Sequence, residues 1–424
     1  MNRRIPWAVL SPVFGGLALL FGCAELAGLE DRERIPDAAP DAAAESPPSA
    51  PEECNLLDDD GDGAIDEGFP WRLGEIKQVS TGTRVEALRA ARMADGRVAL
   101  AWVDAVQEGS RAVRTVTLDA VGVRMDGPLD VATGGAQLGF GIAVCPLDPE
   151  VGVAVGEADD PSGDGRIRIE RFSSQDLKPI GTRVVNDLDW EEPVVVPEAL
   201  LDLTCTSAGY AYLAIDATHQ PWLVWLDQVF HNGKGVLAGA RGTAGTLTSG
   251  MLVGWAVSGV GENGLETVSC GMVSPGGYRQ VLKATEIALV GGGVGVFLEP
   301  HSRAVAWQGD ALAVAASRGG VTSVYPILTL ERNDGVQAAT LGLQFDAQAS
   351  SVVGFRGSLV TTTVTNAGVT NLFRVDSKLH AVDKQPLVVP GASAHTLVGE
   401  GKAPVVIWAS DDRTRILAAP LECE

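Results

Sequence analysis

Several residue types that often carry catalysis or bind nucleic acid are scarce in this sequence. Its 424 residues include five His and four Tyr, and aromatic residues make up only 5%. Lys and Arg together number 32 against 54 Asp and Glu, which gives a formal net charge of −22 at pH 7. A charge this negative argues against binding to nucleic acid and to anionic lipid headgroups, because both are polyanionic. It suits a soluble extracellular surface that tolerates cations.

Motifs that identify common enzyme classes are also missing. The sequence contains no Gly-x-Ser-x-Gly elbow and no His-Glu-x-x-His zinc motif. The stretch Gly259 to Gly264 matches the dinucleotide fingerprint by letter, but a strand-like run follows it where a helix is required. We interpret it as a hairpin turn. The five His are scattered singly and indicate no metal site: His219, His231, His301, His380 and His395.

Long runs with a helical period are absent, which leaves a sequence suited to strands. Apolar residues mostly occur in short runs rich in Val, Thr and Leu, and Gly, Asp, Asn and Ser separate these runs. Such runs between turn-forming residues are typical of β-strands. The sequence therefore predicts an all-β fold, with one large β domain from residue 70 to residue 424.

The strand-like runs recur with a period near 50 residues. A period of this length with several short strands per unit is the signature of a β-propeller, although the Asp-box, Trp-Asp and kelch signatures are missing. We predict seven blades, and the alternative is a set of β-sandwich or jelly-roll domains. Each repeat contains a run that ends in a bulky apolar residue before a polar turn: Leu118-Asp119, Phe172-Ser173, Leu226-Asp227, Leu282-Lys283, Leu330-Glu331 and Val375-Asp376.

The two ends of the β domain are predicted to share one blade. The last unit, Arg413 to Leu417, ends too soon to supply a fourth strand, and the run Gly74 to Val79 lies before the first unit. If this run supplies the missing strand, the ring closes and leaves no exposed sheet edge there. We therefore expect residues 73–80 to pair with the C-terminal unit.

Residues 1–22 have the pattern of a secretion signal. Asn2-Arg3-Arg4 is a basic start, and the apolar stretch Ile5 to Leu20 is too short for a comfortable transmembrane helix. Leu20-Phe21-Gly22-Cys23 then resembles the lipobox of bacterial lipoproteins. The resemblance implies a palmitate-type acyl anchor on Cys23, and Ala24 in the next position favours the outer membrane or cell surface. The alternative is an ordinary signal peptide with an incidental Cys.

Residues 23–53 read as a spacer between membrane and domain. The segment is built from Ala, Pro, Asp, Glu and Ser, a composition that cannot fold alone. Its acidity makes it self-repelling and extended. We expect a disordered tether with no chemistry of its own.

An acidic loop, residues 54–69, follows the tether. Carboxylates fall at alternate positions, and Gly63 stands where a sharp turn is needed. Such a pattern can surround one hard cation, and Ca²⁺ takes six to eight oxygen ligands. It is only partly an EF-hand, because Phe69 occupies the place of the last Glu. The candidate metal ligands are Asp58, Asp60, Asp62, Asp66 and Glu67.

This loop resembles thrombospondin type 3-like calcium loops and a short metal-binding motif related to the MopE copper-binding surface protein, which recurs in secreted proteins of myxobacteria. Gly61 stands where that motif has a second Cys, so no disulfide can form within it. We favour Ca²⁺ over copper because the candidate ligands are carboxylates, with no His, Met or second Cys nearby. The alternative is an acidic, solvated linker. The residues that match the motif are Cys54, Asn55, Asp58, Asp60, Asp62, Gly63, Asp66 and Glu67.

The exported compartment permits disulfides among the five Cys other than Cys23. Ring closure would bring Cys54 and Cys423 together, so we predict a bond between them. Three others end similar runs and are expected at equivalent places in successive blades, either bonded or as small core residues: Cys145, Cys205 and Cys270.

Two functions of different classes remain open. The first is a lipid-anchored envelope protein whose propeller binds or scaffolds an unknown protein or glycan. The second is a secreted polysaccharide hydrolase or lyase that uses paired carboxylates at the propeller channel. The acidic stretches 159–165 and 187–192 are interpreted as solvated loops, with a second cation or a partner contact as the alternative. No catalytic residue is predicted, and the absence of any enzyme motif favours the first function.

Overall fold

The structure is a computed structural model of the whole chain. By its contacts the chain divides into two units, Met1–Ser49 and Ala50–Glu424, and all described residues belong to the second. The described residues are 53–55, 59–60, 66, 68–81, 84–107, 110–133, 137–146, 150–158, 165–184, 197–207, 209–216, 220–227, 232–236, 241–249, 253–260, 266–273, 281–287, 296–297, 305–308, 311–318, 321–329, 347–355, 358–365, 369–376, 381–383, 385–391, 394–399 and 403–424.

This part of the chain forms strands and no helix, as the strand-like runs predicted. It therefore includes no helix with the length and hydropathy of a membrane span. The described strands form seven antiparallel sheets. In the first three sheets, the strands lie in chain order: β3 (Val85–Arg92), β4 (Val98–Gln107), β5 (Ser110–Leu118) and β6 (Arg124–Thr133); β7 (Gln137–Val144), β8 (Glu150–Ala158), β9 (Gly165–Ser173) and β10 (Pro179–Val184); β11 (Pro197–Thr206), β12 (Gly209–Asp216), β13 (Pro221–Asp227) and β14 (Asn232–Val236).

The next three sheets repeat this order, except that β19 and β20 both pair with β21 in the fifth sheet. Their strands are β15 (Arg241–Ser249), β16 (Val253–Val260), β17 (Glu266–Val273) and β18 (Val281–Ile287); β19 (Val296–Phe297), β20 (Val305–Gln308), β21 (Ala311–Arg318) and β22 (Val321–Thr329); β23 (Ala347–Phe355), β24 (Ser358–Thr365), β25 (Thr370–Val375) and β26 (Leu387–Val389).

The seventh sheet joins the two ends of the domain. It contains β27 (His395–Val398), β28 (Val405–Ala409) and β29 (Arg415–Cys423), together with β1 (Trp71–Leu73) and β2 (Lys77–Thr81). Both N-terminal strands pair with β29, on the edge that β28 does not occupy. The pairing of the N-terminal run with the C-terminal unit is therefore present, and β1 extends it beyond the expected residues.

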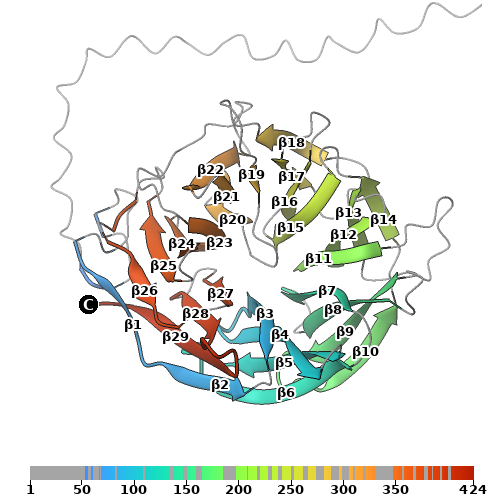
Figure 1. Cartoon of the computed structure of the whole chain (residues 1–424), viewed down its shortest axis with the longest axis horizontal. Helices are drawn as coiled ribbons and strands as arrows, with labels where there is room; N and C mark the ends of the chain where they lie inside the picture. Colours follow the sequence, from blue (N-terminus) through green and yellow to red (C-terminus); the bar gives the residue numbers. More distant parts are fainter. Residues whose placement is uncertain are drawn as a thin grey trace, which may run out of the picture. The chain divides into compact units, whose positions relative to one another are not determined.

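The seven sheets are arranged around a ring (Figure 1). In the fifth sheet we count β19 and β20, which both pair with β21, as the first strand. The first strands of successive sheets contact one another in the order β3, β7, β11, β15, β20, β23 and β27, and β27 contacts β3. This is the arrangement of a β-propeller, with each sheet as a blade. Apolar side chains fill the space between neighbouring sheets. Trp102, for example, is fully buried in a cluster with Ile407 of the seventh sheet.

The first strands run in the same direction, which defines two faces of the ring. A Cβ added to Gly139 of β7 would meet the backbone of Leu200 on β11, and one added to Gly141 would meet the backbone of Leu203. The contacts move in the same direction along both strands, so β7 and β11 run parallel. We call the face at which the first strands end the lower face, and the opposite one the upper face. Because adjacent strands are antiparallel, the turns after first and third strands lie at the lower face.

Among the described residues, the repeat predicted from the sequence has one error of phase; the strand end predicted at Leu330 lies outside them. Leu118 ends the third strand of its sheet, as expected, and Phe172, Leu226 and Val375 lie at or next to the corresponding ends. Leu282, however, lies inside β18, the fourth strand of its sheet, because the third strand ends at Val273. The hairpin predicted at Gly259–Gly264 is confirmed, since Val260 pairs with Glu266 across it.

Candidate functional site

The acidic loop lies only in part within the described residues. Asp60 and Asp66 are described, whereas Asp58, Asp62 and Glu67 lie outside the described residues, and so does Cys23. Among the described residues, no group of three or more His, Cys, Asp or Glu side chains is placed to hold a metal ion. The expected Ca²⁺ site therefore stays a prediction, and we describe the surroundings of its described members.

Asp66 is fully buried and closes the loop on itself. Its Oδ1 accepts a hydrogen bond of 2.9 Å from the backbone N–H of Asn55. Its backbone has a positive φ of 49°, a conformation in which Asp is less disfavoured than most residues. Asp59, which the sequence pattern does not count as a ligand, accepts a bond of 2.8 Å from the Asn55 side chain. Both ends of the segment between Asn55 and Asp66 are thus held together.

Arg374 on β25 fixes the end of this loop to the sixth sheet. Its guanidinium donates to the backbone oxygens of Asp66 at 3.0 Å and Phe69 at 2.9 Å. It also forms an ion pair with Asp383 and lies 4.9 Å from the centre of the Trp71 ring. No local motif in the sequence marks Arg374, which is 308 positions away from Asp66.

A disulfide joins Cys54 to Cys423, with the two Cα atoms 5.5 Å apart. This is the pair expected from ring closure. The bond and β1 attach the same segment to β29, so the start of the domain is fixed both covalently and by strand pairing. Since β29 is a third strand, its end and the disulfide lie at the lower face.

A second disulfide, between Cys145 and Cys205, joins the second and third sheets. Cys145 directly follows β7 and Cys205 lies near the end of β11, so these two Cys do occupy equivalent places in successive sheets. Cys270 does not share this position, because it lies on β17, the third strand of its sheet. The expectation of three equivalent Cys is therefore wrong for Cys270, whose run of residues resembles the other two only locally.

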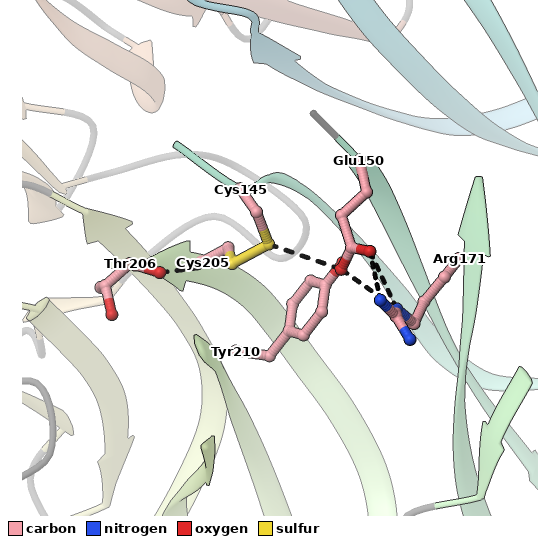
Figure 2. A network of polar contacts seen from close by, with 6 residues as sticks. All are labelled: Cys145, Glu150, Arg171, Cys205, Thr206 and Tyr210. Carbon is pink, nitrogen blue, oxygen red and sulfur yellow. Dashed lines mark hydrogen bonds and ion pairs between the residues drawn. A yellow bond between two sulfur atoms is a disulfide. The ribbon is translucent and has the colours of Figure 1, made fainter. Parts of the chain in front are cut away.

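A polar network beside this disulfide also joins the second and third sheets (Figure 2). The Tyr210 hydroxyl on β12 donates a bond of 2.6 Å to the carboxylate of Glu150, which begins β8. Arg171 on β9 forms an ion pair with the same carboxylate, and Figure 2 shows both side chains directed at it. Burial raises the pKa of Tyr210 well above its usual value, and the bond to Glu150 raises it further.

A third buried contact crosses from the first sheet to the third. Arg89 on β3 donates to Asp202 of β11 at 2.7 Å and to the backbone oxygen of Leu201 at 2.5 Å. Asp202 also accepts a bond of 2.8 Å from the backbone N–H of Leu247 on β15, in the fourth sheet. Arg89 and Asp202 are both buried. The ion pair joins β3 to β11, and the bond from Leu247 joins β11 to β15, so Asp202 connects three first strands.

Neither a protein-family model nor a curated protein sequence matches the chain. The structure is similar to the BP39L lectin from Burkholderia pseudomallei, at 14% identity and a TM-score of 0.50 over 82% of this chain and 97% of the lectin. It is also similar to a protein of unknown function from Dyadobacter fermentans, at 10% identity and 0.49 over 84% and 99% of the two chains. The β-propeller domain of the Trilobed protease from Pyrococcus furiosus matches at 10% identity and 0.46, over 80% and 94%. Likenesses of this kind show the fold alone, which is a β-propeller.

Proposed function

We propose that this protein is a lipid-anchored protein of the bacterial cell envelope, whose propeller binds or scaffolds a protein or glycan and whose acidic loop holds Ca²⁺. The observation that carries the binding role is the closed ring, in which buried charges join neighbouring sheets. Loops at the faces of a rigid scaffold are the usual place for binding residues.

The charged side chains of the described part favour binding over hydrolysis. A polysaccharide hydrolase needs one carboxyl group with a raised pKa, held in an apolar site and near a second carboxylate. Four buried or nearly buried carboxylates of the described part instead form ion pairs with Arg side chains, so they do not lie in an apolar site. These pairs are Asp104 with Arg114, Glu150 with Arg171, Asp202 with Arg89, and Asp383 with Arg374.

The lipid anchor is supported by the signal-like start and by the place where the chain enters the domain. The segment before Cys54 reaches the domain at a disulfide to Cys423, so a pull on the tether acts on a covalent bond. We expect Cys23→Ser to move the protein from the membrane fraction to the soluble fraction. A variant that stays in the detergent phase in the same amount as the wild type would rule out acylation of Cys23.

The Ca²⁺ proposal is supported by the bond between Asn55 and Asp66, because these two residues flank most of the candidate carboxylates in the sequence. A bound ion would neutralise carboxylates that otherwise repel one another. Extracellular calcium modules have Kd values on the order of 10⁻⁴ to 10⁻³ M. Binding should stabilise the folded protein by about 2.7 kcal/mol when free Ca²⁺ exceeds Kd a hundredfold.

Calorimetric titration of the metal-free full chain tests this site. Millimolar Ca²⁺ should give a heat of binding that disappears in Asp58→Ala/Asp60→Ala/Asp62→Ala, while Mg²⁺ should substitute poorly because it demands tighter octahedral geometry. Asp159→Ala/Asp160→Ala/Asp164→Ala is the matched control and should bind as the wild type does. If only this control loses binding, the ion lies in the 159–165 stretch. If the wild type binds no Ca²⁺ up to about 10 mM, residues 54–69 are an acidic linker and not a metal site.

A further inference from the structure

Large apolar side chains are exposed at the lower face, at the outer edge of two neighbouring sheets. Met125 and Ile180 occupy the second positions of β6 and β10, the fourth strands of the first and second sheets, and are 52% and 51% exposed. Val121 and Val123, in the turn that leads into β6, are 47% and 40% exposed. We call these four residues the lower rim patch.

The patch is continuous with the sheet that carries the disulfide to Cys54. The lower turns of the first two sheets touch, since Arg97 donates to the backbone oxygen of Gln175 at 3.4 Å. On the other side, a Cβ added to Gly122 would lie 2.9 Å from the Cβ of Ala418 on β29. The patch therefore begins next to the seventh sheet, where the N-terminal segment enters the domain.

Basic side chains accompany the apolar ones. Arg124 separates Val123 from Met125, and Lys178 lies two positions before Ile180; both are exposed. Long basic side chains beside apolar groups are suited to an interface between water and hydrocarbon, because the stem can lie along the apolar surface while the charge stays in water. Lys178 is paired with Asp176, so the charge near Ile180 is balanced. Such a surface fits a zwitterionic lipid layer better than an anionic one.

We infer that the lower rim patch rests on the zwitterionic lipid surface to which the chain is anchored. This inference builds on the proposed lipid anchor and names the surface that the domain presents to the membrane. The N-terminal segment enters the domain at the lower face, and 30 residues, 24–53, separate Cys23 from Cys54. A coil of that length has an end-to-end distance of roughly 30 Å, and charge repulsion makes an acidic one longer. The tether therefore keeps the patch close to the bilayer, where even a weak contact is populated.

The inference assigns an orientation to the propeller. With the lower face toward the lipid, the upper face points away from it and is open to a ligand. The upper face also carries exposed apolar residues, Val106 at the end of β4 and Val369 just before β25, which are in different sheets on that face. These two residues provide a control of the same chemistry at the opposite face.

Photolabelling from within the bilayer tests the orientation. The full chain is mixed with vesicles of phosphatidylcholine that contain a phosphatidylcholine with a diazirine in its acyl chain, irradiated, and digested for mass spectrometry. We expect label in peptides that contain residues 121–125 and 180, and none in peptides with Val106 or Val369. Met125→Ser/Ile180→Ser should lower this labelling at least tenfold without loss of vesicle flotation, whereas Val106→Ser/Val369→Ser should label as the wild type does.

The Cys23→Ser chain separates this inference from the anchor. At higher vesicle concentration it should label at the same peptides with lower yield, because the tether only raises the local concentration. Wild-type protein that floats with vesicles but labels elsewhere would overturn the orientation while the anchor stands. No label at these peptides in either form overturns the inference as well. A dimer in solution that disappears in Met125→Ser/Ile180→Ser would assign the patch to a second copy and overturn it too.

Discussion

At the scale of single residues, charges that are far apart in the sequence hold the start of the domain in place. Arg374 contacts Asp66, Phe69, Trp71 and Asp383, and all of these contacts depend on its planar group of five donors. Its side chain is buried, so little solvent screens the ion pair with Asp383. One residue of the sixth sheet thus contacts the described end of the acidic loop at both Asp66 and Phe69.

Removal of this guanidinium should destabilise the domain markedly. Arg374→Met would leave the nearly buried Asp383 without its charged partner, which typically costs about 3–5 kcal/mol. Arg72→Met is the matched control, because Arg72 pairs with Glu422 near the same disulfide but at the surface, where an ion pair contributes about 0–1 kcal/mol. Urea unfolding measures both. Equal losses in the two variants would show that Arg374 does not hold the loop.

A half-buried His should make stability depend on pH. Burial lowers the pKa of His395 to about 4, and its Nε2 lies 2.9 Å from the Thr362 hydroxyl. Between the unfolded pKa of about 6.5 and this value, only the unfolded chain binds the proton, so stability falls as the pH falls. By pH 5 the wild type should lose up to about 2 kcal/mol more than His395→Gln, relative to pH 8. Parallel unfolding curves at the two pH values would contradict this.

At the scale of strands, the sequence pattern predicted most of the architecture. The alternation of apolar runs and turn residues is local, and it located third strands such as β5 and the pairing of the N-terminal run with β29. It placed Leu282 in the wrong strand, because a bulky apolar residue before a polar one can occur in any strand of a sheet. The loop motif likewise marks candidate ligands, but says nothing of what holds the loop.

Contacts between sheets could not be predicted, because the partners come from different repeats. The sequence predicts equivalent places in successive sheets for Cys145, Cys205 and Cys270. Equivalent places do not reveal which two of the three Cys are close enough to form a disulfide. Glu150 and Tyr210 are 60 positions apart and belong to no motif. Such pairs depend on how two sheets pack, which a single sequence with no alignment does not reveal.

The hydroxyl of Tyr210 should contribute to the junction of the second and third sheets. Tyr210→Phe removes a donor to the buried carboxylate of Glu150, a bond to a charged group that contributes about 1.5–3 kcal/mol. Tyr212→Phe on the same strand is the control, since burial alone raises the pKa of Tyr212 and no carboxylate takes part. Guanidinium unfolding should rank Tyr210→Phe as the less stable variant. The reverse order would show that Arg171 alone satisfies Glu150.

At the scale of the whole molecule, the ring is closed in two ways, by strand pairing and by a covalent bond. β1 and β2 occupy the outer edge of β29, and Cys54 is bonded to the end of the same strand. Pairing alone can open from an end, whereas the disulfide prevents the N-terminal segment from separating from β29. For the lipid anchor proposed above, this arrangement means that a load on the N-terminal segment would reach the C-terminal strand directly.

The two disulfides should differ in how much they stabilise the ring. Cys54 and Cys423 are separated by 369 positions, and Cys145 and Cys205 by 60. In the chain-entropy model a bond restricts the unfolded chain more when its loop is longer, which gives about 6 kcal/mol for the first bond and about 4 kcal/mol for the second. Cys54→Ala/Cys423→Ala should therefore melt at a lower temperature than Cys145→Ala/Cys205→Ala in differential scanning calorimetry.

The buried position of Cys145 and Cys205 works against this order, since their removal also leaves a small cavity. If the Cys145→Ala/Cys205→Ala variant is the less stable one, packing between the second and third sheets outweighs the closure of the ring, and the strands β1 and β2 hold the ends together without the covalent bond.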